Sequence, residues 1–383
     1  MTSLNDTSGD TDERAALVHR ELLQLAALLI VAVATFALTR AVAASNHDRS
    51  LRDAAEWYRR GQQQLERRQL DAAIDDFRRA TVRDRAERRY VLALARALTL
   101  KQDYEAARSA LLTLRESAPE DPDINLELAR LAAERQDVTE AVRYYHNALY
   151  AAWPSDQTDA RRRVRLELIR FLLTRGQVGR AQAELLSLAA TDLPDDAATR
   201  LDVARLFATA GDATHALDQF QRTLLLAPEN RDALLGAGTA AFHLGNYLLA
   251  RTYLHRAPSD VEDIGRTREI VDLVLSDDPL ANRIGSSERR RRLVEDFTYA
   301  EERLTVCLAQ RGGRTDAMTV VQSDMDTFAD QLKPRDVMDQ DTIEAGVDLI
   351  DRIEHQVEQQ CGPLTARDQA LLLIGRQHGA DAR

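Results

Sequence analysis

The hydrophobic pattern in the middle of the chain repeats at a nearly constant interval. Six alanines mark the repeat. A large apolar residue stands four positions after each alanine, and a small or aliphatic residue stands twelve positions before each alanine. The intervals between successive alanines are 34, 34, 40, 35 and 34, and the alanines are Ala73, Ala107, Ala141, Ala181, Ala216 and Ala250. Apolar residues between these marks recur at three- and four-residue steps, so each unit is predicted to be a pair of amphipathic helices.

This frame resembles the tetratricopeptide repeat, a helix–turn–helix unit whose length is about 34 residues. The frame places six repeats, together spanning residues 54–264, at 54–87, 88–121, 122–155, 162–195, 197–230 and 231–264. The longest interval predicts about six extra residues near 155–161, which we expect to form a longer loop. The resemblance implies an all-α α-solenoid whose neighbouring hairpins bury their apolar faces on each other. A generic helical bundle with chance spacing is the alternative.

The resemblance also implies that the first helix of each repeat lines a concave surface. One column of that surface holds leucines, and the column four residues later, on the same helix face, holds arginines. The candidate groove residues are Leu92, Arg96, Leu126, Arg130, Leu166, Arg170, Leu201 and Arg205. An apolar strip beside guanidinium groups suits a protein or peptide partner that carries acidic and apolar groups. The alternative is structural, because Glu127, Glu167 and Asp202 each stand three residues before an arginine of their own helix.

The N-terminal part of the chain holds an uncharged, mostly apolar run at 22–39, between Glu21 and Arg40. As a helix the run would span about 27 Å, close to the thickness of a bilayer core. We therefore expect a polar tail at 1–21, a transmembrane helix or signal anchor at 22–39 and a linker at 40–53. A signal peptide cleaved after 41–43 and a long buried helix are the alternatives.

The charges beside this run give conflicting indications of membrane orientation. Residues 1–20 carry two arginines and residues 40–60 carry five, which by the positive-inside rule favours a cytoplasmic soluble domain. A short polar tail before an apolar run is nevertheless typical of a segment that exports the downstream chain, and long domains translocate largely regardless of charge. For a bacterial cell we expect a single-pass inner-membrane protein with a periplasmic soluble domain, with the cytoplasmic orientation as the alternative.

The repeat frame is lost near residue 280, and residues 265–383 are predicted to form a C-terminal helical bundle. Four apolar helical patterns succeed one another there, at about 286–310, 318–332, 343–357 and after Pro363. Cys307 lies near the end of the first pattern and Cys361 at the end of the third, so an up-down-up order places both sulfurs at one end. A disulfide, which requires an oxidising compartment, and two buried thiols both fit.

Composition and the absence of known motifs exclude several classes of function. The net charge of −11 disfavours nucleic-acid binding, and two cysteines are too few for a four-cysteine zinc site. The eight histidines show no metal-ligand spacing, and no phosphate loop or nucleophile motif is present. We therefore expect no catalysis, no cofactor and no metal, and we expect the four arginines at 289–292 to be a solvated face.

The sequence as a whole predicts a membrane-anchored scaffold that binds a protein or peptide in a concave groove, in envelope assembly or secretion. A cytoplasmic-facing adaptor and a permanent structural subunit of a membrane complex are the alternatives.

Overall fold

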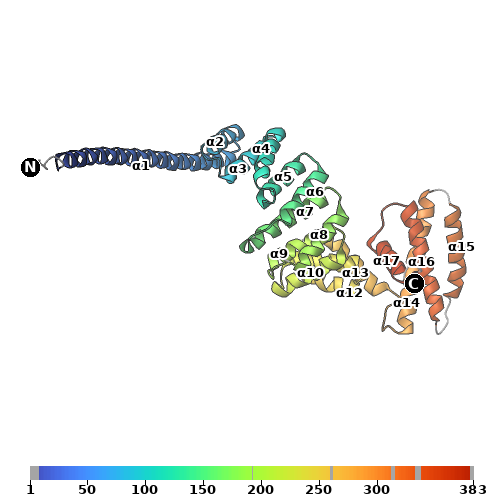
Figure 1. Ribbon diagram of the computed structural model, residues 1–383. Helices are drawn as coiled ribbons and strands as arrows, with labels where there is room; N and C mark the ends of the chain where they lie inside the picture. The colour runs from blue at the N-terminus through green and yellow to red at the C-terminus, as the bar shows by residue number, and fades with distance from the viewer. Residues whose placement is uncertain (1–7, 192, 259–261, 312–314, 333–337, 380–383) are drawn as a thin grey trace, which may run out of the picture. The chain divides into compact units, whose positions relative to one another are not determined.

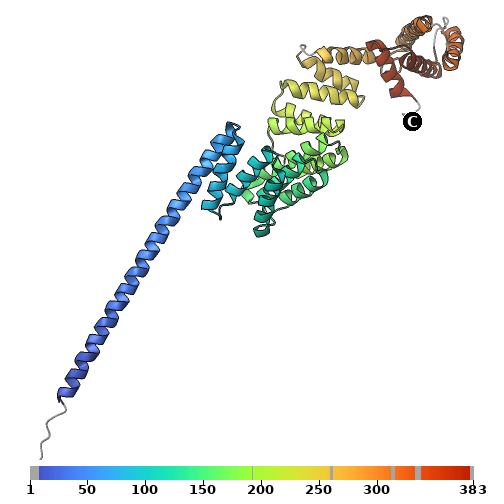
Figure 2. The same cartoon turned by 90° about the horizontal axis from the view of Figure 1, so that it is seen from above.

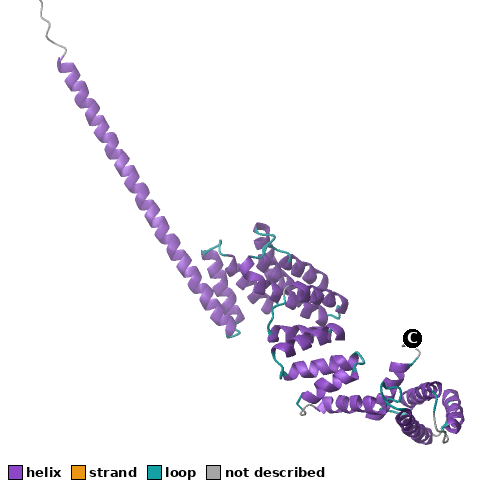
Figure 3. Cartoon of the chain, turned by 90° about the horizontal axis from the view of Figure 1, so that it is seen from below, coloured by secondary structure: helices purple, strands orange, loops and turns teal. Residues whose placement is uncertain are grey.

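The computed structural model describes residues 8–191, 193–258, 262–311, 315–332 and 338–379, and within these ranges it contains helices, turns and loops but no strand (Figures 1 and 3). The all-α prediction is confirmed. The chain divides into two compact units, Met1–Leu168 and Ile169–Arg383, and the division falls inside one helix.

The first unit consists of antiparallel helical hairpins. Its first hairpin pairs the C-terminal part of the very long helix α1 with α2, and the next two pair α3 with α4 and α5 with α6. The bounds are α1 Ser8–Glu66, α2 Leu70–Arg83, α3 Arg88–Leu100, α4 Tyr104–Ser117, α5 Pro122–Glu134, α6 Val138–Leu149, the 3₁₀ turn η1 Ser155–Gln157 and α7 Thr158–Thr174, which enters the second unit.

The second unit continues with hairpins and ends in a bundle (Figure 2). Helix α9 pairs with α10, α11 pairs with α12, and α13 contacts both α12 and the last helix, α17. The bounds are α8 Val178–Thr191, α9 Ala197–Thr209, α10 Ala213–Leu226, α11 Arg231–His243, α12 Tyr247–Arg256, α13 Glu262–Asp277, α14 Ser286–Arg311, α15 Asp316–Gln331, α16 Gln340–Gln360 and α17 Ala366–His378.

The repeated frame corresponds to the core of each hairpin. All six marker alanines have no exposed surface, and the large apolar residue four positions later is buried in every hairpin. Two glycines show why the position twelve residues earlier is small. A methyl group at Gly61 would lie 2.6 Å from the Phe77 ring, and one at Gly238 would lie 2.5 Å from a Leu254 methyl. In these two hairpins the helices can therefore approach as closely as they do only because this position has no side chain.

The turn inside each hairpin repeats as well. The residue five positions before each marker alanine has a positive φ, between 58° and 74°, at Arg68, Gln102, Gln136, Gly176, Gly211 and Gly245. In four of the six hairpins an Asp or Asn comes next and caps the second helix through its side chain: Asp103, Asp137, Asp212 and Asn246. The left-handed residue ends one helix and the cap starts the next, so the turn needs few residues.

Helix α1 differs from the expected layout. The segment 40–53, expected to be a linker, is helical, so the apolar run continues into the first hairpin without a break. One helix within the described ranges, over Leu25–Glu66, is long and apolar enough to cross a membrane, and the described side chains of its apolar run are exposed. The first seven residues of the expected polar tail lie outside the described residues.

The extra residues near 155–161 also differ from the expectation of a longer loop. They form η1 and the first turn of α7, which is 17 residues long where α3, α5, α9 and α11 each have 13. The insertion is therefore absorbed mainly as helix, which keeps its backbone groups hydrogen-bonded.

The C-terminal bundle is formed by α14, α15, α16 and α17. The apolar positions of the predicted patterns are buried in it, among them Leu293, Phe297, Met325 and Ile353. Cys307, on α14, and Cys361, directly after α16, are joined as a disulfide with their Cα atoms 5.5 Å apart. The up-down-up order of α14 to α16 thus brings both cysteines to one end of the bundle.

Candidate functional site

The arginine column of the first unit is built into an ionic network around the buried carboxylate of Glu127. Arg96 donates from Nε to Glu127 Oε1 at 2.7 Å, and the same oxygen accepts a bond of 2.8 Å from Arg130. Arg130 also holds both oxygens of Glu167 at 2.7 and 2.8 Å, and Tyr145 Oη donates to Glu167 at 2.9 Å. Only 4 % of the Glu127 side chain is exposed. The column therefore joins successive hairpins through carboxylates.

The pKa values of Arg130 and Tyr145 are both raised in this network, so Arg130 stays charged and Tyr145 stays a hydrogen-bond donor. The hydrogen bonds from Arg130 to Glu167, together with the neighbouring Glu127 charge, raise the pKa of the Arg130 guanidinium. Burial, and after it the charge of Glu167, raises the pKa of the Tyr145 hydroxyl, which stays protonated and donates. Glu127 is nearly fully buried and is held by both Arg96 and Arg130, so the loss of both arginines would leave a buried charge without compensation.

A hollow of about 450 Å³ opens onto this network. Five of its lining residues are charged members of the column or of the adjoining helix, and the others are uncharged or apolar: Leu65, Arg96, Thr99, Leu100, Gln102, Tyr104, Glu127, Arg130, Glu134 and Glu167. Three carboxylates face two guanidinium groups there, so the hollow has no excess of positive charge.

The arginine column of the second unit is more accessible. Arg170 pairs with Asp202 at 2.6 Å, and Arg205 pairs with Asp232 at 2.5 Å. All four side chains are about half exposed. Exposed ion pairs contribute only about 0–1 kcal/mol, so these two arginines can exchange their partners at little cost.

A larger hollow of about 820 Å³ lies in the second unit. It is lined mainly by α10 and α11, through Gln182, Ala208, Gly211, Asp212, Ala213, Thr214, Ala216, Phe220, Leu235, Gly236, Thr239, Ala240, His243 and Leu244. Arg205 stands three residues before Ala208, and Asp232 stands three residues before Leu235. Residues at this spacing share a helix face, so the Arg205–Asp232 pair adjoins the hollow.

Gly236 shapes the floor of this hollow. A methyl group at this position would lie 2.2 Å from the Phe220 ring, so the ring packs against the backbone of α11.

The leucine column does not form the exposed strip that we expected. Leu92, Leu126 and Leu166 are buried, and Leu201 is half-buried. These side chains pack into the helical array, because the apolar face of a helix is stabilised most where water is excluded. Leu235, at the same repeat position in the next hairpin, is half-buried and lines the hollow between α10 and α11.

The arginine pairing also differs from the alternative of pairs within one helix. Each arginine contacts a carboxylate of the following hairpin, and Arg130 in addition contacts Glu127 three residues before it.

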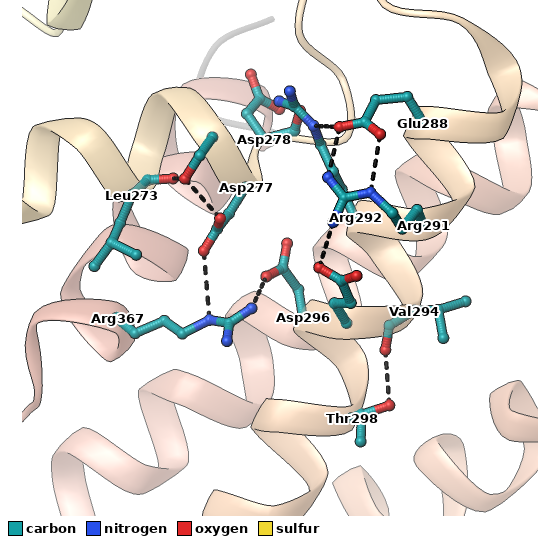
Figure 4. Close-up of polar contacts among 12 residues, drawn as sticks. Leu273, Asp277, Asp278, Glu288, Arg291, Arg292, Val294, Asp296, Thr298 and Arg367 are labelled. Carbon is teal, nitrogen blue, oxygen red and sulfur yellow. Dashed lines mark hydrogen bonds and ion pairs between the residues drawn. The ribbon is translucent and has the colours of Figure 1, made fainter.

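The arginine run at 289–292 is integrated into the structure and not simply solvated. Arg289 donates to the carbonyl oxygens of Pro279 and Ala281, and Arg290 donates to that of Leu332. Arg291 and Arg292 both hold Glu288 (Figure 4). Arg289, Arg290 and Arg292 thus satisfy carbonyl groups at helix ends and in a turn, whereas Arg291 is half exposed and pairs with carboxylates.

The bundle also buries carboxyl groups. Asp296 and Asp277 both contact Arg367, at 2.9 and 3.4 Å (Figure 4). Asp368 accepts from Arg303 at 2.7 Å and from Tyr299 at 2.6 Å. Glu354 has no exposed surface, and neither of its carboxyl oxygens has a hydrogen-bond partner among the described residues.

Burial raises the pKa of two of these carboxyl groups, Glu354 and Asp296. The pKa of Glu354 rises to about 8, first by burial and then by the charge of Asp368. Burial raises the pKa of Asp296 to about 7, although Arg367 acts in the opposite direction. Within the described ranges, no group of three or more His, Cys, Asp or Glu side chains is placed to hold a metal ion.

Comparison with known proteins finds one matching family model and several solved structures of low similarity. The tetratricopeptide-repeat family model matches residues 58–113, 92–157 and 204–261. The pilF structure from Pseudomonas aeruginosa is 16% identical, with a TM-score of 0.39, over 55% of this chain and 91% of its own. PilW, described as a widely conserved type IV pilus biogenesis factor, is 20% identical, with a TM-score of 0.39, over 56% of this chain and 97% of its own.

YrrB, described as a TPR protein with an unusual peptide-binding site, is 16% identical, with a TM-score of 0.33, over 51% of this chain and 95% of its own. No curated protein matches the chain. The family match coincides with the helical hairpins and with their buried alanine frame. The chain therefore contains tetratricopeptide repeats, at residues 58–157 and 204–261.

Proposed function

We propose that this protein is a membrane-anchored scaffold whose second unit binds a protein or peptide that presents a carboxylate next to an apolar side chain. Tetratricopeptide repeats generally mediate protein–protein interactions, and they are generally not enzymes. The observation that carries the proposal is the hollow beside the half-exposed Arg205–Asp232 pair.

The partner's apolar group would enter the hollow, and its carboxylate would replace Asp232 on Arg205. The apolar side chains of Phe220, Leu235 and Leu244 line the hollow. A guanidinium group binds a carboxylate through a planar fork, which orients the partner as well as attracting it. Arg170, whose pair with Asp202 is equally exposed, offers a second accessible guanidinium group within the same unit.

The first unit is less suited to this role. Its arginines are already held by Glu127 and Glu167, one of which is nearly fully buried, and releasing them would break the network.

The anchor is the second part of the proposal. The exposed apolar run of α1 is long enough to cross a bilayer core, and exposure of such a run to water is unfavourable by roughly 25 cal/mol per Å². We propose that α1 spans a bacterial inner membrane with the repeats in the periplasm, in envelope assembly or secretion. The Cys307–Cys361 disulfide supports this compartment, because disulfides persist in oxidising surroundings.

The binding proposal is tested by replacing Arg170 and Arg205 together with alanine in the full-length protein. Partners are crosslinked in membranes and quantified by mass spectrometry. We expect the capture of the specific partner to fall about ten-fold or more for each arginine, as for the loss of a charge-assisted hydrogen bond. The matched control is Arg222→Ala, which removes an equally exposed arginine that pairs with Asp218 on its own helix.

Equal capture by the double variant and by the control, with both proteins folded, would exclude the arginine column as a binding site. A phosphatase fused after Arg383 tests the orientation, since it is active only in the periplasm.

A further inference from the structure

The arginine column and the carboxylates that it contacts follow one rule in three successive steps. In each step an arginine pairs with the carboxylate that stands three residues before the next arginine of the column. The pairs are Arg96–Glu127, Arg130–Glu167 and Arg170–Asp202. Their sequence separations are 31, 37 and 32, and the 37 includes the six extra residues after the third repeat. The first helix of each following hairpin thus supplies one carboxylate at a fixed repeat position.

The fourth step breaks this rule, because the corresponding position is Gly236, 31 residues after Arg205. Arg205 instead contacts Asp232, one helical turn earlier on α11. Among the described residues this contact is a single hydrogen bond from Nη2, whereas Arg130 holds both oxygens of Glu167 with Nε and Nη2. Arg205 therefore uses a substitute for the carboxylate that the sixth repeat lacks, and it holds that substitute less completely.

The residue that packs against this position changes as well. Tyr145 stands four residues after its marker alanine, and its hydroxyl donates to Glu167 at 2.9 Å. Phe220 stands at the same repeat position but has no hydroxyl, and a Cβ at Gly236 would lie 2.2 Å from its ring. Gly236 and Phe220 both line the hollow of about 820 Å³. The fourth step therefore lacks both the carboxylate and its donor, and it leaves an open place beside Arg205, which we call the Gly236 gap.

The surroundings of the Gly236 gap suit an acidic side chain of another polypeptide. Asp212 carries the only carboxylate among the described lining residues, and it is already engaged, because it caps α10 and contacts the His215 ring at 2.8 Å. The hollow continues along α11 from Gly236 to Leu244, a rise of about 12 Å. This length accommodates roughly four residues of an extended segment, so an apolar side chain near the acidic one can enter the same hollow.

We propose that a partner protein completes the arginine column at the Gly236 gap with the side-chain carboxylate of an Asp or Glu in an extended segment. Nε and Nη2 of Arg205 hold this carboxylate as Arg130 holds Glu167. The inference rests on the proposed function, gives the partner's carboxylate a position and makes Gly236 the residue that determines specificity. A side chain is assigned because all three built-in carboxylates reach their arginines from side chains. Asp232 is half exposed, so its release into water costs little.

The test fills the Gly236 gap from within the chain. Phe220→Leu combined with Gly236→Asp copies the preceding step, in which Leu185 and Asp202 stand at these two positions. We call this the Asp variant, and its added carboxylate should hold Arg205 in place of the partner's. The matched Asn variant combines Phe220→Leu with Gly236→Asn and adds the same shape without the charge. Hydrogen exchange on α11 establishes that both variants are folded.

The probe is a displayed library of random seven-residue peptides that are joined to their carrier at both ends, selected on the full-length protein in detergent. The selected peptide is synthesised with blocked ends, and its Kd is measured by fluorescence anisotropy beside that of the analogue in which the acidic residue is replaced by its amide. The ratio of these two Kd values reports the carboxylate, because a steric change in the hollow affects both peptides alike.

We expect the amide analogue to bind the wild-type protein about ten-fold more weakly or worse, as for the loss of a charge-assisted hydrogen bond. The ratio should fall to about one in Arg205→Ala and in the Asp variant, because in both Arg205 no longer serves the peptide. It should stay near the wild-type value in the Asn variant and in Arg222→Ala, which removes an exposed arginine that does not line the hollow.

The inference is overturned if the Asp variant keeps the wild-type ratio, or if the Asn variant loses it to the same extent. A ratio that is then still lost in Arg205→Ala leaves the proposed function standing, with another position for the carboxylate. A ratio that survives in Arg205→Ala refutes the site of the proposed function as well. A library that yields no acidic peptide also overturns the inference, and crosslinking with Arg170 and Arg205 replaced decides the proposed function separately.

Discussion

Replacing Glu354 with glutamine should stabilise the C-terminal bundle at alkaline pH. The carboxyl group has no exposed surface, and its two oxygens have no hydrogen-bond partner among the described residues. The charges of Asp368, Asp296 and Asp351 oppose its ionisation, and Arg303 favours it only in part. Glutamine keeps the shape of the neutral acid and cannot ionise.

The size and the pH range of the effect can be worked out from the pKa. A carboxyl group whose pKa is 4.5 unfolded and about 8 folded binds more protons in the folded state between these values. Stability is therefore fully present below about pH 4.5 and falls as the pH rises toward 8. Above pH 8 the full difference corresponds to about 5 kcal/mol, and relaxation around the charge reduces the measured value to about 2–4 kcal/mol.

The assay is hydrogen exchange of the full-length protein across a urea series, read on peptides from α16 at pH 5 and at pH 8.5. We expect Glu354→Gln to resemble the wild type at pH 5 within about 1 kcal/mol and to be more stable by about 2–4 kcal/mol at pH 8.5. Glu358→Gln removes an exposed carboxylate one turn further along the same helix and should have no such effect.

A stability gain of the same size at both pH values would show that the gain does not come from ionisation. No gain at pH 8.5 would show that the buried carboxylate is compensated by groups or water in solution, and the argument from burial would then be wrong.

Two other substitutions test the hairpin turn and the disulfide. Gln136 has a φ of 62°, so Gln136→Gly should raise the free energy of unfolding by about 0.5–1 kcal/mol, measured by hydrogen exchange on α5 and α6. Gly211 has a φ of 74°, so Gly211→Ala should lower the free energy of unfolding in the second unit. A change of the opposite sign in either variant would refute the argument from backbone strain. Cys307→Ser should destabilise the bundle by about 4 kcal/mol in the chain-entropy model, given the sequence separation of 54, and dithiothreitol should have the same effect on the wild type but no effect on the variant.

The repeat frame was predictable because close packing limits what each position can hold. The marker alanines and the large apolar residue after each of them repeat at a fixed distance, and helical hairpins bury these same positions. The turns were harder to predict. Their left-handed residue is glycine in three hairpins but Arg68, Gln102 and Gln136 in the others. The residue type therefore does not show that all six positions share one backbone conformation. The signal was the Asp or Asn directly after this position in four hairpins.

The candidate site was predictable only in part, because ion pairs depend on contacts between repeats. Spacing within a helix indicated that Glu127 could pair with Arg130, but it gave no reason for Arg96 to reach the same carboxylate from the preceding hairpin. Burial of the leucine column also required the neighbouring helix. A carboxylate 27 to 37 residues after each arginine was present in the sequence and becomes meaningful only once successive hairpins are stacked.

In the second unit the arginines proposed to bind the partner also pair with carboxylates of the following hairpin. The proposed function therefore requires that successive hairpins stay packed when these ion pairs are broken. Helices α9 and α11 are in contact, and Val203, Phe207 and Ala233 on these helices are buried. Burying one such aliphatic or aromatic side chain contributes about 1.5–3 kcal/mol, whereas the exposed Arg205–Asp232 pair contributes about 0–1 kcal/mol. A ligand carboxylate that takes Arg205 from Asp232 therefore leaves the packing of α9 on α11 intact. The same exchange at Arg130 would remove one of the two arginines that hold the buried Glu127, which is why we expect binding at the second unit's arginines.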